Sequence, residues 1–78
     1  MSHTPHELAE EFPEHVERIH ALKRSSARFA RLCDQYHEVN RAIHRAEART
    51  EAVAEQHESS LRRQRLALKD EIASMLAA

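Results

Sequence analysis

The sequence predicts an all-α fold: an αα-hairpin preceded by short N-terminal helices. Two observations predict it. The 78 residues include no glycine and only two prolines, Pro5 and Pro13, and they are rich in alanine, glutamate and arginine, which favour helix. In the stretch FARLCDQYHEVNRAIHRAE, residues 29–47, apolar residues recur at alternating gaps of three and four, which is the spacing of one helix face. A chain of this length forms a single domain, residues 1–78.

A short helix is expected over residues 5–11. Thr4 can act as its N-cap, Pro5 suits the first helical position, and Glu7 stands three residues after Thr4 to complete a capping box. The helix ends before Pro13, because a proline ring inside a helix clashes with the preceding turn.

A second short helix is expected over residues 13–24, with Pro13 at its start. The serine pair Ser25–Ser26 then offers a new N-cap, so a break is expected before the next helix begins. The apolar stripe of this second helix consists of Val16, Ile19 and Leu22.

Two long helices, over residues 26–50 and 58–77, are expected to form the hairpin. With Phe29 at heptad position a, mostly apolar residues occupy a and d as far as Val53, but from Leu61 onward they come one residue late. A turn within the polar stretch AEQHESS would explain the slip. The alternative is one continuous helix of about 50 residues in an extended coiled coil, because the connection holds no glycine or proline. The predicted seam consists of Phe29, Leu32, Tyr36, Val39, Ile43, Ala46, Val53, Leu61, Leu68, Ile72 and Met75.

The seam also predicts self-association. Two helices alone leave one side of an apolar seam in water, and a chain this short rarely buries a sufficient core by itself. Two hairpins packed as a four-helix bundle cover that side, so a homo-oligomeric bundle is expected, with a dimer favoured. Asn40 and the Tyr36 hydroxyl lie at or beside the seam and need hydrogen-bond partners if buried, so we expect them to fix the packing geometry.

Three segments carry a resemblance to a known family. FARLCDQYHEVNRAIHRAE, LRRQRLALKDEIASML and the upstream FPEHVERIHALK, in their order and spacing, resemble the YdcH-like family of small bacterial proteins, a domain of unknown function. The similarity extends over residues 8–76. It implies a small, cytosolic α-helical hairpin, and it implies no activity, substrate or catalytic residue.

Histidine is the unusual feature of the composition, with seven in 78 residues. Cys33 and His37 are four residues apart and could contact one metal ion from a single helix face, whereas His44 lies about 10 Å further along the helix. There is no HExxH motif and no pair of CxxC motifs, so solvated or interhelical histidines are the preferred interpretation. No metal, cofactor or catalytic residue is predicted, and Cys33 is expected at heptad position e, at the edge of the seam.

Two functional hypotheses follow from these features, and neither is an enzyme, since no pocket or glycine-rich phosphate loop is expected. The leading hypothesis is a self-associating protein–protein interaction module with an unidentified protein partner. The alternative is a nucleic-acid-associated protein that uses a ridge formed by Arg41, Arg45 and Arg49. That ridge has no interleaved aromatic residues and the net charge of the chain is −1, so nucleic acid is the less favoured partner.

The expected location is the cytoplasm. One cysteine per chain suits a reducing compartment. The acidic N-terminus lacks the basic and apolar regions of a secretion signal, and no run of about 18 apolar residues could span a membrane.

Overall fold

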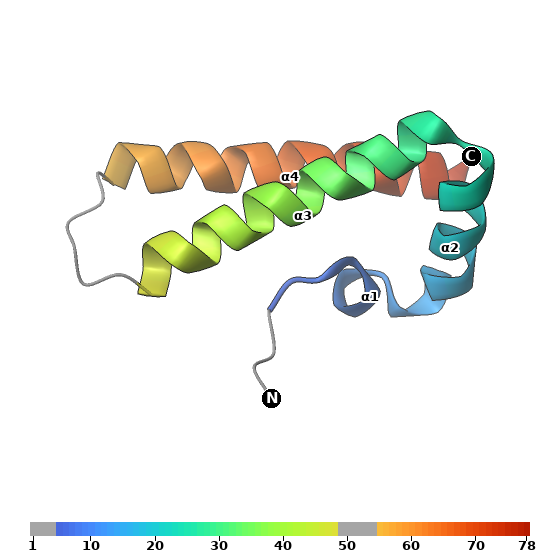
Figure 1. Cartoon of the computed structure of the whole chain (residues 1–78), viewed down its shortest axis with the longest axis horizontal. Helices are drawn as coiled ribbons and strands as arrows, with labels where there is room; N and C mark the ends of the chain where they lie inside the picture. The colour runs from blue at the N-terminus through green and yellow to red at the C-terminus, as the bar shows by residue number, and fades with distance from the viewer. Residues whose placement is uncertain (1–4, 49–54) are drawn as a thin grey trace.

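The computed structural model describes residues 5–48 and 55–78, and every element within these ranges is helical. The all-α prediction is therefore confirmed for this part of the chain (Figure 1). The elements are α1 (Leu8–Glu11), a 3₁₀ turn (Pro13–His15), α2 (Val16–Ser25), α3 (Ala27–Ala48) and α4 (Glu55–Ala77).

The two long helices, α3 and α4, lie side by side and run in opposite directions (Figure 1). Arg62 Nη2 on α4 donates to Glu47 Oε2 on α3 at 2.8 Å. Closer to the middle of both helices, Arg65 Nη1 donates to Asn40 Oδ1 at 2.8 Å. Residue numbers thus rise along α4 as they fall along α3, which makes the pair antiparallel.

Helix α2 lies across the end of the pair where α3 begins and α4 ends (Figure 1). Arg18 on α2 donates from Nε to the Leu76 carbonyl at 2.9 Å and from Nη2 to the Ala78 carbonyl at 2.7 Å. Carbonyls at the end of an α-helix have no backbone donor within that helix. Arg18 supplies the missing donors and fastens α2 to the end of α4.

The break between α2 and α3 lies where the serine pair predicts it. Helix α2 ends at Ser25, and Ser26 is extended, with φ −134° and ψ 112°. Ser26 Oγ accepts a hydrogen bond from the backbone N–H of Phe29 at 3.1 Å, which is the bond that an N-cap serine makes to the third residue of its helix.

The first helix is shorter than predicted, because it begins at Leu8 instead of residue 5. His6 has a left-handed backbone (φ 64°) and Glu7 an extended one (φ −64°, ψ 154°). Glu7 is therefore the N-cap and cannot complete the predicted capping box with Thr4, which lies outside the described residues. The two carbonyls that precede Glu7 are bonded to side chains of α3, so a tertiary contact overrides the local helix signal.

The other bounds differ from the predictions by a few residues. The predicted helix 13–24 opens as a 3₁₀ turn and continues as α2, whereas residues 49–50 of the predicted helix 26–50 lie outside the described ranges. Helix α4 begins three residues before the predicted residue 58. Its extra turn contains glutamate and glutamine, which favour helix, and Glu58 lies 3.6 Å from Arg62 one turn later.

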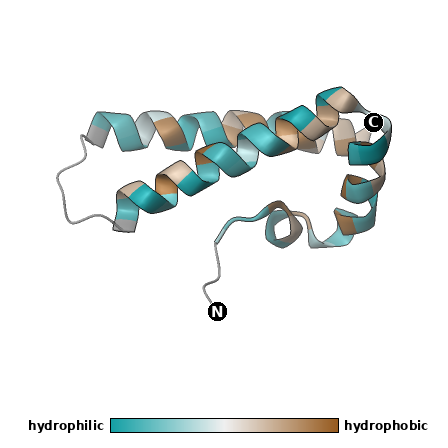
Figure 2. Cartoon of the chain, viewed as in Figure 1, coloured by the Kyte–Doolittle hydropathy of each residue, from teal (hydrophilic) through white to brown (hydrophobic). Residues whose placement is uncertain are grey.

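The core lies between α3 and the elements that surround it. Figure 2 shows apolar residues on α2, α3 and α4 separated by hydrophilic turns. Among the described residues α3 contributes more buried apolar side chains than any other element, because it contacts both α2 and α4. The buried apolar residues are Leu8, Ile19, Phe29, Leu32, Cys33, Tyr36, Ile43, Ile72 and Leu76.

Candidate interaction surfaces

The predicted seam divides into two groups in the structure. One group is buried within the single chain: Phe29, Leu32, Tyr36, Ile43 and Ile72. The other group is half-buried: Val39, Ala46, Leu61, Leu68 and Met75. Val53, the remaining member, lies outside the described residues. The chain therefore covers only part of the apolar surface that the heptad pattern marks.

The spacing of the half-buried group assigns it to one surface, which we call the open face (Val39, Ala46, Leu61, Leu68 and Met75), although Leu68 and Met75 also pack in part against the core. Its members are spaced by seven on each helix, and seven residues fall only about 20° short of two full turns, so they lie in one row per helix. Val39 and Leu68 line a shared groove of about 420 Å³ between α3 and α4. Gln35, Glu38, Gln64 and Ala67 complete its lining.

The opposite side of the α3–α4 pair is covered by the N-terminal elements. Asn40 follows Val39 and Lys69 follows Leu68, each turned about 100° around its helix. Both contact residues 5–11: Asn40 Nδ2 donates to the Pro5 carbonyl at 3.0 Å, and Lys69 Nζ donates to Glu11 Oε1 at 2.9 Å. The open face and the N-terminal elements thus flank the helix pair on different sides.

Three α3 side chains spaced by four, which we call the polar row (Tyr36, Asn40 and His44), hold the N-terminal segment. Tyr36 Oη donates to the His6 carbonyl at 2.6 Å, and His44 Nε2 lies 3.0 Å from the Pro5 carbonyl oxygen. Burial of the phenol raises the pKa of Tyr36 to about 12. Within the described residues no buried side-chain nitrogen or oxygen is left without a partner. Tyr36 and Asn40 therefore both bond to the N-terminal segment, and Asn40 also accepts a hydrogen bond from Arg65 of α4.

Further side-chain contacts accompany the polar row. His37 Nδ1 lies 3.0 Å from Glu7 Oε2, and Lys69 Nζ lies 5.9 Å from the centre of the Phe12 ring. Glu11 accepts the hydrogen bond from Lys69, and this bond, more than any other contact, lowers the pKa of the Glu11 carboxyl. The N-terminal segment is consequently attached to both long helices.

A hollow of about 160 Å³ lies beside the N-terminal segment, between α1, α2 and α3. Its lining combines apolar side chains with four that can carry charge. The lining residues are Leu8, Ala9, Val16, Ile19, Glu7, His20, Lys23 and His37.

Cys33 and His37 lie in different surroundings on α3. Cys33 is fully buried rather than at the edge of the seam, because the N-terminal elements cover that side of α3, and burial raises the pKa of its thiol. His37 is paired with Glu7. In the described residues no group of three histidine, cysteine, aspartate or glutamate side chains could hold a metal ion.

Two of the three residues of the arginine ridge lie in the part of the chain that the structure describes. Arg41 and Arg45 are exposed, and Arg41 Nη2 lies 3.7 Å from Glu38 Oε2 on the same helix. Arg49 lies outside the described residues. Near the same end of α3, a hydrogen bond from Arg62 is the main cause that lowers the pKa of Glu47.

Sequence reasoning missed the docking of the N-terminal segment on α3. The polar row has a sequence signal, since Tyr36, Asn40 and His44 repeat every four residues and share one face of a helix. Its partners are main-chain carbonyls, however, and every residue has one. No pattern of side chains could identify which carbonyls these would be.

Comparison with known proteins identifies a family. A family model described as "Protein of unknown function (DUF465)" matches residues 29–76, which include most of α3 and nearly all of α4. This family includes the YdcH-like small proteins, so the resemblance seen in the sequence is confirmed over residues 29–76, and residues 8–28 of the expected range lie outside the match. No curated protein and no solved structure matches the chain significantly. Among the described helices none is long and apolar enough to cross a membrane.

Proposed function

We propose that this chain, which belongs to the DUF465 family of proteins of unknown function, is a self-associating interaction module. In this proposal the open faces of two copies pair to form a four-helix bundle. The observation that supports it is the apolar row spaced by seven residues on each of two neighbouring helices, which the described chain leaves partly exposed. Such rows are typical of helices that pack against further helices.

A second copy suits the open face better than a charged partner does. A copy related by a twofold axis presents the same rows, so the contact is self-complementary. The polar lining of the groove is mainly the neutral amides of Gln35 and Gln64, and the carboxylate of Glu38 already has Arg41 nearby. A standard interface removes about 800 Å² from each partner, which is roughly one-seventh of the 5650 Å² accessible surface of the chain.

The proposed role is noncatalytic and cytoplasmic. The thiol of Cys33 is buried with a raised pKa, so it acts as an apolar packing group rather than as a nucleophile. A free buried thiol is ordinary in a reducing compartment.

The arginine ridge receives less support as a nucleic-acid surface. Arg41 forms an ion pair with Glu38. Arg41 and Arg45 belong neither to the open face nor to the polar row. No aromatic side chain on which a base could stack is exposed beside them in the described part of α3.

Sedimentation equilibrium of the Val39→Gln, Leu68→Gln double variant tests self-association. Both side chains are half-buried, so the helical circular dichroism should be retained. Replacing apolar contacts with amides at the centre of the interface should weaken association by at least tenfold. At about 100 μM chain, we expect the wild type near twice the 9.0 kDa chain mass and the variant near 9.0 kDa.

Leu66→Gln is the matched control, because Leu66 is the large apolar residue most exposed in the described chain, at 58%. It stands two residues before Leu68, turned about 200° away from the groove, so its replacement should leave the mass of the assembly unchanged. A wild type that sediments as a monomer, or a double variant that remains a dimer, would overturn the proposed interface.

A further inference from the structure

On the side opposite the open face, the chain binds a short peptide segment of its own, residues 5–12. The polar row bonds to main-chain carbonyls of this segment. Because every peptide has such carbonyls, these contacts would hold the backbone of another chain in the same way.

Three side chains of the segment supply selectivity. Leu8 is 4% exposed and belongs to the core. Glu7 precedes it and pairs with a histidine of α3, and Glu11 follows three residues later and pairs with Lys69 of α4. The surface is thus complementary to a leucine with one carboxylate directly before it and another one turn after it.

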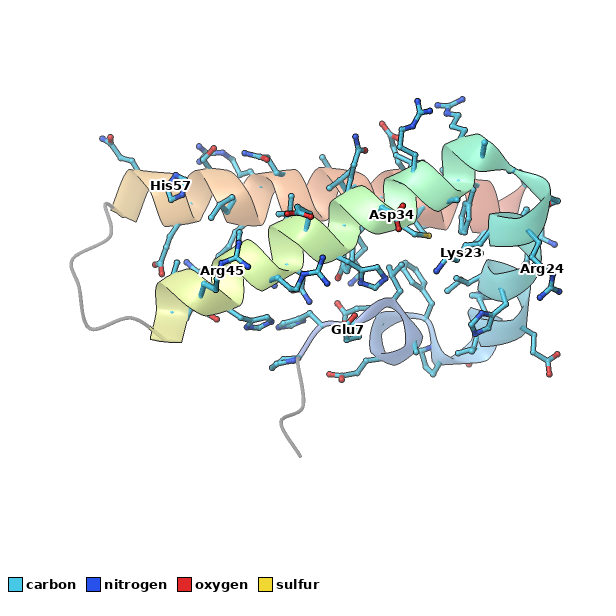
Figure 3. All side chains as sticks on the ribbon, in the orientation of Figure 1. Glu7, Lys23, Arg24, Asp34, Arg45 and His57 are labelled. Atoms are coloured by element: carbon cyan, nitrogen blue, oxygen red, sulfur yellow. The ribbon has the colours of Figure 1, made fainter. Side chains whose placement is uncertain are left out.

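The segment leaves part of this surface unused. Ala9 lines the hollow of about 160 Å³ and is too small to fill it. Figure 3 shows Lys23 reaching from α2 toward the space between α1 and α3, whereas Arg24 points away from it. No carboxylate in the described part of the chain forms an ion pair with Lys23. A longer apolar side chain in the place of Ala9 would gain burial that the segment itself does not have.

We propose that this surface binds an acidic, leucine-containing helical segment of another protein, and that residues 5–12 occupy it when that partner is absent. The partner segment would carry the Glu-Leu core of residues 7–8, a bulky apolar residue in place of Ala9 and the acid that pairs with Lys69. The site lies on the opposite side of the helix pair from the open face, so it does not depend on self-association.

A different protein fits better than a second copy for a physical reason. The segment of a second copy makes the same contacts as the resident one, yet the resident segment is tethered and has an effective concentration in the millimolar range. A competitor prevails only through contacts that the resident segment lacks. The unfilled hollow provides such contacts.

Fluorescence anisotropy with two labelled peptides tests the proposal on the full chain. One peptide is TPHELAEEF, residues 4–12, and the other is the same peptide with Ala9→Leu. Three added carbons that become about half buried should tighten binding roughly tenfold. We expect the Ala9→Leu peptide to bind the wild-type chain about tenfold more tightly than the native peptide.

Two protein variants locate the site. Glu11→Gln in the full chain loosens the resident segment and leaves Lys69 for the glutamate of the peptide, so peptide affinity should rise about two- to fivefold, the range expected for an exposed ion pair. Adding Lys69→Gln to the Glu11→Gln chain removes the partner of the peptide glutamate and should abolish this gain in affinity. Arg63→Gln removes one positive charge from an exposed position elsewhere on α4 and should leave affinity unchanged.

Several outcomes would overturn the proposal. Absence of saturable binding to the Glu11→Gln chain would exclude the site, and an equal loss in Arg63→Gln and Lys69→Gln would indicate nonspecific charge attraction. Equal affinity for both peptides would show that the hollow adds nothing, so no outside segment would have an advantage over the tethered resident one and the proposal would be overturned. Repeating the titration with the Val39→Gln, Leu68→Gln chain separates this result from self-association, because peptide binding should persist there.

Discussion

The two sides of the α3–α4 pair differ in chemistry and in whether the chain covers them. The side that holds the N-terminal segment is polar at its centre, with the polar row and Lys69 bonded to residues 5–11 of the same chain. The open face is apolar and partly exposed, and Val39 and Leu68 line its groove. Buried polar groups without partners destabilise a fold strongly, so they must be satisfied within each chain. Half-buried apolar side chains are tolerated in water and can be covered later by a partner.

Buried and half-buried seam residues should differ most in their effect on the free energy of unfolding when they are replaced on α4. Ile72→Ala removes a fully buried side chain and should lower the free energy of unfolding by about 2–5 kcal/mol. Leu68→Ala should lower it by less in a single chain, and its effect should grow with protein concentration because dimerisation stabilises the folded state. Urea unfolding of both variants at two protein concentrations measures these losses. Equal, concentration-independent losses would contradict the division into buried and open groups.

A pH titration sharpens the comparison on the covered side. The pKa of Tyr36 is about 12 in the folded chain and about 10 for an unfolded tyrosine. Between these values the unfolded chain releases the phenolic proton first, so stability falls as the pH rises from about 10 to 12, by up to about 2.7 kcal/mol. Tyr36→Phe should lack this loss, although the His6 carbonyl then loses a donor, which lowers its stability at neutral pH by about 1 kcal/mol.

The measurement is the difference in unfolding free energy between wild type and Tyr36→Phe as a function of pH. Subtracting the variant cancels the titration of lysine and arginine side chains, which both chains share. A difference that stays constant between pH 10 and 12 would show that the Tyr36 hydroxyl is not buried as described.

The smallest effect on the free energy of unfolding is expected for the exposed arginines of α3, which belong neither to the open face nor to the polar row. Arg41→Gln with Arg45→Gln should change the free energy of unfolding by no more than about 0.5 kcal/mol, because both side chains are exposed. Nucleic-acid binding near physiological salt should be the same in the wild type and the variant. Saturable binding whose log–log salt slope shrinks by about 0.7–0.9 for each arginine removed would instead support the ridge as a phosphate-binding surface.

Local signals predicted some of the helix ends well and others poorly. The break at Ser25–Ser26 was predictable because Ser26 Oγ reaches a backbone N–H only three residues away. The start of α1 was not, although its capping signals were as clear, because the carbonyls of Pro5 and His6 bond to side chains of α3 that stand 35 and 30 residues later in the sequence. A sequence signal is reliable where its partner is local.

The sequence by itself determined the helical class, the family and the apolar residues of α3 and α4, because these depend on composition and on a period that neighbouring residues display. Tertiary structure alone decided which of those residues the chain covers. Cys33 is fully buried although it flanks the heptad seam, and Val39 remains partly exposed although it lies within the seam. The reason is that the N-terminal segment packs on one side of α3 only, and the choice of side depends on long-range hydrogen bonds to main-chain carbonyls, which no residue pattern encodes.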